Sequence, residues 1–384
     1  MALLLLRGRR RGDSLPLLLR EALPGKVSFD QEHLDAAARW IGRSADSASG
    51  LAHRAYDLRL GWVEPDAAST GAAIPTLLAV ADIRHSAEAR TSASAFGAAL
   101  VEAQRPEGCF WSTGGRSEIG TTVDALFGLL ALTRSGEEPQ AEKAAIAAAE
   151  WLCQRQDDDG AWHRLGDRPE PEGRAIWALA MADAILGRAA FGDAAVAHLG
   201  WIERQRRSDG WIDWSERSSV EIRSVAATVE GLLEAGVVLD DRSAFEAGAG
   251  LLIGLERGYR LAGSGVRLRW RNHLAGAISP DWRGTRRTAC VEGSARIALC
   301  AYRAAGLGAV DPSRRRRFGD EVLDPARSAQ ALGGVPVDLV GGVPASAPIW
   351  GGTAPLQLTT MAAKALVDAL LERRDGGLPR ERLG

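Results

Sequence analysis

Two kinds of helical segment alternate along the chain. In residues 31–42 the apolar side chains recur with the spacing of one helix face, which is typical of a helix with one side in water. Residues 70–83 are instead apolar or small almost throughout, as expected for a helix surrounded by protein. The same order, an amphipathic helix and then an apolar one, recurs to the end of the chain and predicts a series of helical hairpins.

Six hairpins are expected. Their helices are predicted at residues 31–42 and 70–83, 87–104 and 121–133, 141–156 and 172–186, 193–205 and 219–235, 243–255 and 285–305, and 314–332 and 356–372. Three loop glycines, Gly108, Gly160 and Gly210, lie about 50 residues apart, a period that indicates one repeated supersecondary unit. Six such units close naturally into a ring. The pattern therefore predicts an all-α (α/α)6 toroid of six helical hairpins, with the apolar helices around a central cavity and no separate β domain.

The two ends of the chain are expected to lie outside this ring. Residues 1–28 are expected to form a partly ordered leader. Its apolar run precedes an arginine cluster, the reverse of the order in a signal peptide, and is too short to cross a bilayer. Residues 29–372 are expected to form a single toroid domain. Residues 373–384 are charged and are expected to form a flexible tail.

Composition narrows the class of protein. The chain of 384 residues is 46% hydrophobic, enough for a large core, and its formal net charge is −2. Such a charge argues against nucleic-acid or membrane-surface binding. The four cysteines form no CxxC pair, so reduced thiols in a cytoplasmic protein are expected rather than disulfides or a metal site. We expect no transmembrane segment and no cofactor, and the sequence carries no prediction of the oligomeric state.

Residues 151–162 combine a helix end with a glycine turn and an aromatic residue. Their Gln156, Gly160 and Trp162 resemble the QW motif, the repeat of terpenoid cyclases and squalene-hopene-cyclase-like proteins. Residues 104–110 are a close second copy and residues 205–211 a third with disturbed spacing, whereas the first, fifth and sixth units lack this spacing.

The wider chain, over about residues 31–372, is also similar to bacterial prenyltransferase or squalene-oxidase repeat-containing proteins. Some of those belong to polysaccharide or natural-product gene clusters. The resemblance implies the toroid fold but leaves the reaction open, because one fold hosts many chemistries.

The chain departs from the catalytic motifs of those families. Residues 157–159, three aspartates, are the nearest approach to the Asp-x-Asp-Asp acid motif of class II terpene cyclases, yet they lie in a turn. The zinc-binding set of protein prenyltransferases, made of Asp, Cys and His, has no counterpart in the sequence. We therefore expect an enzyme of cyclase or transferase type that has neither the acid motif nor a metal site.

Candidate site residues gather where each inner helix is expected to begin. Those helix ends lie at one end of the ring, and their free N–H groups favour anions. The catalytic candidates are Asp124, Glu172, Glu221 and Asp281. The candidates for substrate binding are Arg174, Arg223, Arg286, Arg287, Trp111, Trp214, Trp270, Trp282, Trp350, His163 and Tyr56. Glu172 with Arg174, and Glu221 with Arg223, could equally be buried ion pairs between helices. Trp162 is expected mainly to hold neighbouring hairpins together.

Three functions remain open. The principal hypothesis is a biosynthetic enzyme with an isoprenoid or polyprenyl-phosphate-type substrate, in which aromatic rings stabilise carbocations and arginines bind a diphosphate. The alternative is a glycan-active epimerase, lyase or hydrolase on an acidic polysaccharide, with Glu221 and either Glu172 or Asp281 as acid and base. The third is a ligand-binding toroid without catalysis. Arginines at the cavity mouth argue against a plain hydrocarbon cyclase.

Overall fold

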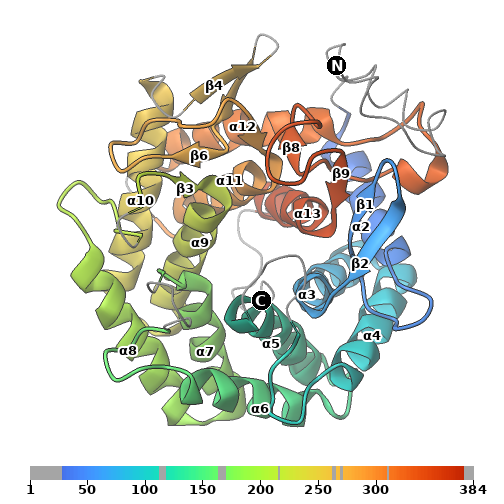
Figure 1. The fold of residues 1–384 in the computed structure, drawn as a ribbon, viewed down its shortest axis with the longest axis vertical. Helices are drawn as coiled ribbons and strands as arrows, with labels where there is room; N and C mark the ends of the chain where they lie inside the picture. Colours follow the sequence, from blue (N-terminus) through green and yellow to red (C-terminus); the bar gives the residue numbers. More distant parts are fainter. Residues whose placement is uncertain are drawn as a thin grey trace.

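The computed structural model describes residues 28–111, 118–162, 170–214, 217–261, 265–268, 271–308 and 311–375. Within these residues twelve helices form six hairpins, and the hairpins close into a ring (Figure 1). One helix of each hairpin lies on the inside of the ring and packs on the inner helices of both neighbouring units, so that the last unit meets the first. The expected all-α (α/α)6 toroid is confirmed.

The two sets of helices follow the two predicted patterns. The outer helices are α2 (Asp30–Arg43), α4 (Ala87–Glu102), α6 (Ala141–Gln154), α8 (Ala189–Gln205), α10 (Arg242–Arg260) and α12 (Pro312–Ala329). The inner helices are α3 (Ala67–Arg84), α5 (Glu118–Ser135), α7 (Gly173–Leu186), α9 (Ile222–Val238), α11 (Val291–Gly306) and α13 (Thr360–Asp375). The largest difference from prediction is the start of α11, expected at residue 285, because the residues just before Val291 form a strand.

Glycine lets the inner helices approach one another closely. A Cβ at Gly71 of α3 would lie 2.4 Å from the Cα of Ala125 in α5. A Cβ at Gly231 of α9 would lie 2.1 Å from the carbonyl carbon of Gly173 in α7. No larger residue fits at such backbone contacts without displacing a helix. Small residues are therefore a packing requirement of the inner ring, which explains their abundance in the second helix of each hairpin.

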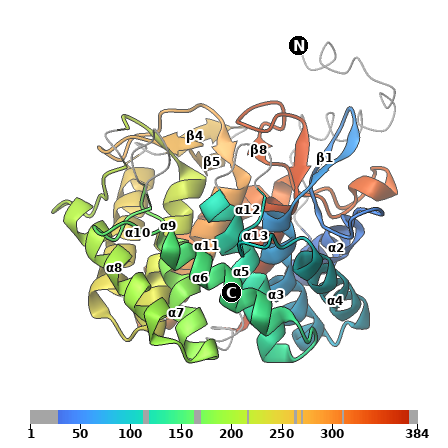
Figure 2. The same ribbon diagram turned by 60° about the horizontal axis from the view of Figure 1, so that its bottom comes forward.

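Short strands lie in the loops that precede the inner helices, at one end of the ring (Figure 2). β1 (His53–Asp57) pairs with β2 (Gly61–Pro65) on one side and with β9 (Gln357–Thr359) on the other, which joins the first unit to the last. The two-stranded pairs are β3 (Val220–Glu221) with β6 (Ala277–Ile278), β4 (Gly265–Leu268) with β5 (Arg271–Leu274), and β7 (Ala289–Cys290) with β8 (Ser346–Ala347). These pairings fix the loops that carry residues toward the mouth of the ring.

Glutamine side chains connect successive units. Gln156 Nε2 donates to the carbonyl oxygen of Gly160 in its own turn at 3.0 Å and to that of Ala194 in the next outer helix at 2.9 Å. Gln104 makes the equivalent two contacts in the second unit. The glutamine of this turn therefore joins one hairpin to the next, because it satisfies a carbonyl on each side.

The sixth unit makes the same contact with a different spacing. Gln330 Nε2 donates to the carbonyl oxygens of Gly341, at 3.1 Å, and of His33 in α2, at 3.0 Å. The glutamine and the glycine are 11 residues apart here and four apart in the third unit. The spacing is lost, as the sequence indicates, but the contact is retained across a longer turn. It also helps to close the ring, because it joins the last outer helix to the first.

The C-terminal helix extends further than expected. α13 continues to Asp375, and Arg373, expected in a flexible tail, forms ion pairs with Asp30 at 2.7 Å and with Asp320 at 2.9 Å. These two carboxylates hold the last turn of α13 against α2 and α12. The rest of the expected tail, residues 376–384, and the expected leader up to residue 27 lie outside the described residues. None of the described helices has an apolar stretch long enough to cross a lipid bilayer.

Candidate functional site

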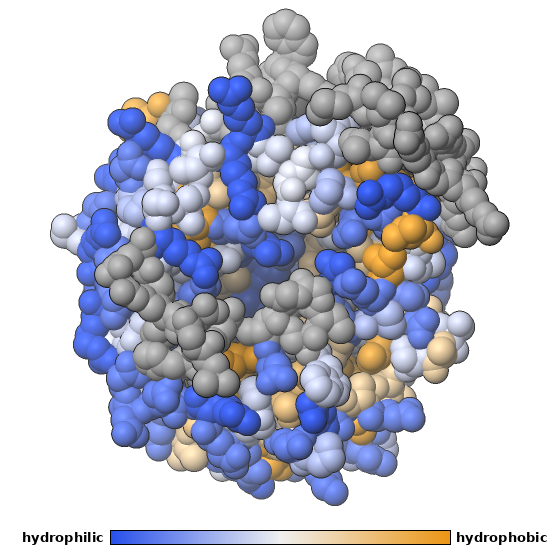
Figure 3. All heavy atoms as spheres, viewed as in Figure 1, coloured by the Kyte–Doolittle hydropathy of each residue, from blue (hydrophilic) through white to orange (hydrophobic). Residues whose placement is uncertain are grey.

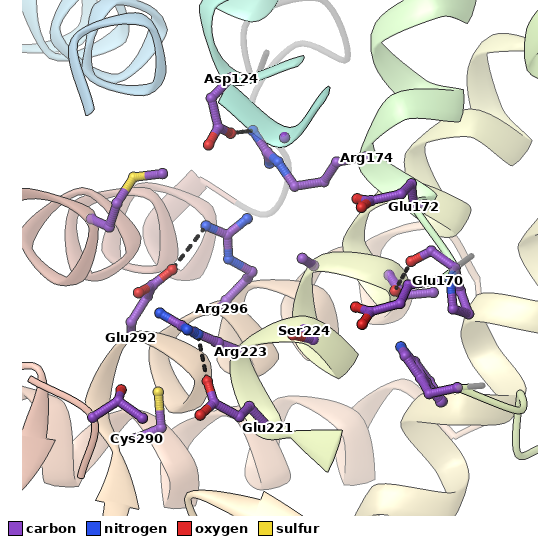
Figure 4. Close-up of a pocket in the computed structure, with 18 of the residues that line it drawn as sticks. Asp124, Glu170, Glu172, Arg174, Glu221, Arg223, Ser224, Cys290, Glu292 and Arg296 are labelled. Carbon is purple, nitrogen blue, oxygen red and sulfur yellow. Dashed lines mark hydrogen bonds and ion pairs between the residues drawn. The ribbon is translucent and has the colours of Figure 1, made fainter. Parts of the chain in front are cut away.

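A polar cavity opens at the end of the ring where the inner helices begin. Its volume is about 580 Å³, and Figure 3 shows a hydrophilic hollow near the centre of this face. Charged residues reach the cavity from the first two turns of α5, α7, α9 and α11 and from the loops in front of them (Figure 4). This volume lies within the range of small-molecule sites, about 300–1,000 Å³.

Arg174 forms part of the cavity floor and is held there by buried partners. Its Nη1 donates to Glu230 Oε2 at 2.9 Å and its Nη2 to Asp124 Oδ1 at 3.2 Å. The guanidinium also lies over the ring of Phe127, 4.4 Å from the ring centroid. Since the side chain of Arg174 is only 8% exposed, it is a fixed part of the wall.

Glu230 links this arginine to a second one. Its Oε2 also accepts from Arg296 Nη1 at 2.5 Å, and Arg296 Nη2 lies 3.5 Å from Glu292 Oε1. Burial alone would raise the pKa of Glu230, but the charges of Arg296 and Arg174 outweigh it and bring the pKa to about 2. Burial lowers the pKa of Arg296, but the charges of Glu230 and Glu292 outweigh burial, and the pKa lies above its usual value. Glu230 and Arg296 are therefore ionised at neutral pH, and the network ties α7, α9 and α11 together.

Glu221 lies between two arginines at the mouth of the cavity. Its Oε2 is 2.7 Å from Arg223 Nε, and its Oε1 accepts from Arg286 Nη1 at 2.9 Å. The side chains of Arg223 and Arg286 are 48% and 42% exposed, in contrast to the buried arginines of the floor. The 2.7 Å contact between Arg223 and Glu221 is made by Nε, so this contact leaves the two terminal nitrogens of the guanidinium for a ligand. We name Arg223, Arg286 and Glu221 the arginine clamp.

Two further carboxylates face each other across the cavity. Glu172 precedes α7, Glu292 lies in the first turn of α11, and Figure 4 shows them on opposite sides.

The carboxylates also keep Arg223 charged. Burial lowers the pKa of Arg223, but the charges of Glu292 and then Glu221 outweigh burial and raise the pKa above its usual value. The cavity thus combines carboxylates that can exchange protons with guanidiniums that can bind an anion.

Cys290 also lines the cavity, but its thiol is poorly suited to act as a nucleophile. Its Sγ accepts the N–H of Gly293 at 3.3 Å and caps α11. Burial, followed by the charge of Glu292, raises the pKa of the thiol to about 12, and the thiolate is the reactive form. Among the described residues, no group of three or more His, Cys, Asp or Glu side chains is arranged to hold a metal ion.

The predicted site residues fall into three groups. Those that line the cavity are Asp124, Glu172, Glu221, Arg174, Arg223, Arg286 and Trp214. Those that the structure places elsewhere are Asp281, Arg287, Trp111, Trp282, Trp350 and Tyr56. His163 and Trp270 lie outside the described residues. Trp214 is 2% exposed, so it contributes an apolar section of wall rather than a projecting platform.

A tight turn moves Asp281 and Trp282 away from the cavity, contrary to expectation. Asp281 is 60% exposed and pairs with Arg283 at 3.0 Å. Trp282 adopts a positive φ of 64° and packs edge-on against Trp211, with ring centroids 5.1 Å apart. A non-glycine residue rarely adopts such a φ, so the sequence gives no sign of this turn. Asp281 is therefore not a partner for Glu221 in proton transfer.

The other displaced candidates pack on protein or face water. Tyr56 is buried edge-on against a tryptophan ring, 5.2 Å between centroids. Trp111 is 62% exposed, and the guanidinium of Arg105 lies over its ring at 4.1 Å. Trp350 is half-buried against the core, and Arg287 is exposed. Their loops fold back as strands or turns, so nearness in sequence to an inner helix does not bring a side chain to the cavity.

Several lining residues are not among the predicted catalytic and binding candidates: Arg54, Glu170, Arg217, Cys290, Glu292 and Arg296. Glu292 and Arg296 are four residues apart at the start of an inner helix, a spacing that places both on one helix face and could have identified them. Glu170 and Arg217 form an ion pair between two loops. No periodic signal marks such loop residues.

Comparison with known proteins supports the fold. The family model of the squalene-hopene cyclase C-terminal domain matches residues 59–219, less than half of the chain. No curated protein matches the sequence. The likeness to terpenoid-cyclase-like α/α toroids is therefore supported at the level of the superfamily, and no narrower family is shown.

Solved structures with a similar fold include glycan-active enzymes. An unsaturated glucuronyl hydrolase specific for heparin has a TM-score of 0.67 and 15% identity, over 90% of this chain and 96% of that chain. The cellobiose 2-epimerase from Bacillus thermoamylovorans has a TM-score of 0.69 and 10% identity, over 89% and 98%. A polysaccharide lyase has a TM-score of 0.60 and 11% identity, over 92% and 99%. At these identities the likeness shows the fold alone.

Proposed function

We propose that this protein is a glycan-active enzyme that takes an acidic sugar into the polar cavity. The observation that carries the proposal is the arginine clamp, in which Arg223 and Arg286 share Glu221 and present half-exposed guanidiniums to one cavity. A guanidinium binds a carboxylate, such as that of a uronic acid, through two parallel hydrogen bonds. The similar structures, among them a glucuronyl hydrolase and a polysaccharide lyase, support this choice.

The composition of the cavity wall argues against the isoprenoid hypothesis. An isoprenoid chain is stabilised by apolar and aromatic surface, whereas this lining is dominated by charged side chains from four inner helices and their loops. Of the predicted aromatic residues that the structure describes, only Trp214 lines the cavity. One aromatic wall beside several arginines and carboxylates suits the mixed polar and apolar surface of a sugar ring.

Glu172 is the residue that we assign to proton transfer. Hydrolases, lyases and epimerases of sugars all need a group that donates or accepts a proton at the substrate. Glu221 has an oxygen engaged by each of two arginines, so its role is to orient the clamp. Glu172 comes from a different helix start and faces Glu292 across the cavity (Figure 4). A bound sugar would therefore lie between these two carboxylates, with its acidic group on the clamp.

A substrate screen tests this function. The protein is incubated with uronic-acid oligosaccharides, saturated and unsaturated, with their neutral counterparts, and with isoprenoid diphosphates, and the products are read by mass spectrometry. We expect conversion of acidic sugars and its loss in Glu172→Gln. Conversion of an isoprenoid diphosphate and of no acidic sugar would contradict the proposal. Binding of acidic sugars without conversion of any compound would favour the non-catalytic toroid.

A further inference from the structure

The turn glycine of four units packs against the next outer helix in the same way. A Cβ built on this glycine would lie between 2.0 and 3.0 Å from one carbonyl oxygen of that helix. The glycines are Gly108, Gly160, Gly210 and Gly341, and the residues that follow the contacted carbonyls are Ala148, His198, Leu251 and Ala37, respectively. All four of these residues are fully buried. Three of them are apolar, so the packing of the ring does not itself require a polar side chain at this position.

His198 uses both of its ring nitrogens. Nδ1 lies 2.9 Å from the carbonyl oxygen of Gly160, which can only accept, so Nδ1 carries the proton. Nε2 is then the acceptor for the backbone N–H of Glu172, at 3.1 Å. The ring stacks on Trp201, 5.4 Å between centroids, and lies against Trp162 at 4.5 Å. The imidazole is therefore fixed in one tautomer and one orientation.

We propose that His198 is a positioning residue that orients Glu172 for proton transfer, an inference that rests on the proposed function. Glu172 is the N-cap of α7, and its own side chain makes no capping hydrogen bond. Its backbone needs another restraint, because helix termini lack the hydrogen bonds of the helix interior. His198 supplies that restraint through the N–H of Glu172 itself. Of the four equivalent positions, the polar one lies next to the inner-helix start that carries the proposed acid.

This arrangement gives the glycine turn a second role. Through Gln156 the turn joins two hairpins, and through the carbonyl of Gly160 it also fixes the imidazole that reaches Glu172. A small misplacement of a catalytic group lowers the rate by up to about 100-fold. A substitution of His198 should therefore change the rate of turnover, although His198 does not itself line the cavity.

Two substitutions separate positioning from mere packing. His198→Gln can place its amide oxygen near the site of Nε2 and still accept the N–H of Glu172. His198→Asn is shorter and reaches only Gly160. Hydrogen–deuterium exchange of residues 170–176 and steady-state kinetics on an acidic oligosaccharide are measured for both variants. For His198→Asn we expect about tenfold faster exchange in this segment and a kcat lowered by about 10- to 100-fold with KM little changed. For His198→Gln we expect values near those of the wild type.

The control is His33→Asn. His33 is also fully buried and its Nδ1 lies 2.6 Å from Gln330 Oε1, so its loss affects stability without touching α7. Wild-type exchange of residues 170–176 in His198→Asn would overturn the inference, as would faster exchange with an unchanged kcat. If the wild type converts no acidic sugar, the proposed function fails, and the exchange measurement alone then decides whether His198 restrains Glu172.

Discussion

Glu221 Oε2 lies 2.7 Å from Nε of Arg223, a contact that uses neither terminal nitrogen of the guanidinium. An arginine held in this way has a defined orientation and still offers its outer pair of N–H groups to a ligand. The second oxygen of Glu221 holds Arg286 in the same region of the cavity. A single carboxylate therefore organises two half-exposed cations, and this relationship distinguishes the clamp from the buried ion pairs beneath it.

The clamp predicts that the shape of Arg223 matters as well as its charge. Arg223→Lys keeps the positive charge but removes the planar fork, so we expect about tenfold or more weaker binding of a uronic-acid disaccharide, measured by calorimetry. Arg242→Lys is the control, because Arg242 is 90% exposed and pairs with Glu246 on the outer surface. Equal affinities for the wild type and Arg223→Lys would argue against bidentate recognition.

Substitutions of Glu172 and Glu221 should have different effects on kcat and KM. Glu172→Gln removes the group assigned to proton transfer, so kcat should fall by about 100- to 10,000-fold with a smaller change in KM. Glu221→Gln weakens the hold on Arg223 and Arg286, so KM should rise more than kcat falls. The reverse pattern would show that Glu221 is the acid or base and that Glu172 serves binding.

Glu230 should contribute strongly to stability. Glu230→Gln preserves the shape of the side chain but leaves Arg174 and Arg296 buried beside a neutral group, which should cost about 3–5 kcal/mol in the free energy of unfolding at pH 7. The measurement is urea denaturation. Glu246→Gln, which breaks an exposed pair on α10, should cost less than about 1 kcal/mol. A similar cost for both variants would mean that the buried network adds no more than a surface pair.

The buried imidazole of His198 predicts a pH dependence of stability. Burial lowers its pKa from 6.5 to about 4, against the opposing effects of the bond to Gly160 and the charge of Asp159. In the unfolded chain the imidazole takes up a proton near pH 6.5, whereas in the folded protein it stays neutral. Its contribution is therefore present above pH 6.5 and is lost as the pH falls toward 4, by roughly 3 kcal/mol in all.

Comparison with His198→Gln isolates this effect. The variant has no imidazole to titrate. Between pH 7 and pH 4 the wild type should therefore lose roughly 3 kcal/mol more of its unfolding free energy than the variant loses. Chemical denaturation at a series of pH values gives this difference directly. A difference that stays constant over the series would mean that His198 is accessible to protons in the folded state.

The close contact of Gly341 with α2, which joins the last unit to the first, should be necessary for full stability. A Cβ at Gly341 would lie 2.0 Å from the carbonyl oxygen of Ala36, and its φ is +95°. Gly341→Ala should therefore lower the unfolding free energy by at least about 1–3 kcal/mol. Gly333→Ala is the matched control in the same loop, because nothing lies within 4 Å of a Cβ there. Equal stabilities would show that the turn can shift away from α2.

Periodicity predicts the ring but not the inside of the cavity. The small residues of the inner helices, such as Gly71 and Gly231, repeat because backbones must touch there, so the sequence carries a clear signal for them. The turn at Gly341 joins two units as the turn at Gly160 does. Its glutamine and glycine are 11 residues apart instead of four, so a search for the repeated spacing does not find it. The same glutamine and glycine contacts therefore form in different units, although the number of residues in the turn differs.

The candidate site is only partly predictable for a similar reason. Residues in the first turn of an inner helix, such as Arg174 and Arg223, are placed by the helix and were found. Loop residues depend on strand pairing and on turns such as that at Trp282, which nothing in the local sequence announces. One of the two partners of Arg174 illustrates a further limit, because Glu230 lies two turns into another inner helix and no local pattern links the two.

The affinity of the protein for a glucuronic-acid disaccharide and for its neutral glucose counterpart tests the central claim most directly. Calorimetric titration of the wild type should show binding of the acidic sugar at least about tenfold tighter than that of the neutral one. Arg223→Ala should abolish this preference, and the surface control Arg242→Ala should keep it. Equal affinity of the wild type for the two sugars, or a preference that survives in Arg223→Ala, would contradict the account.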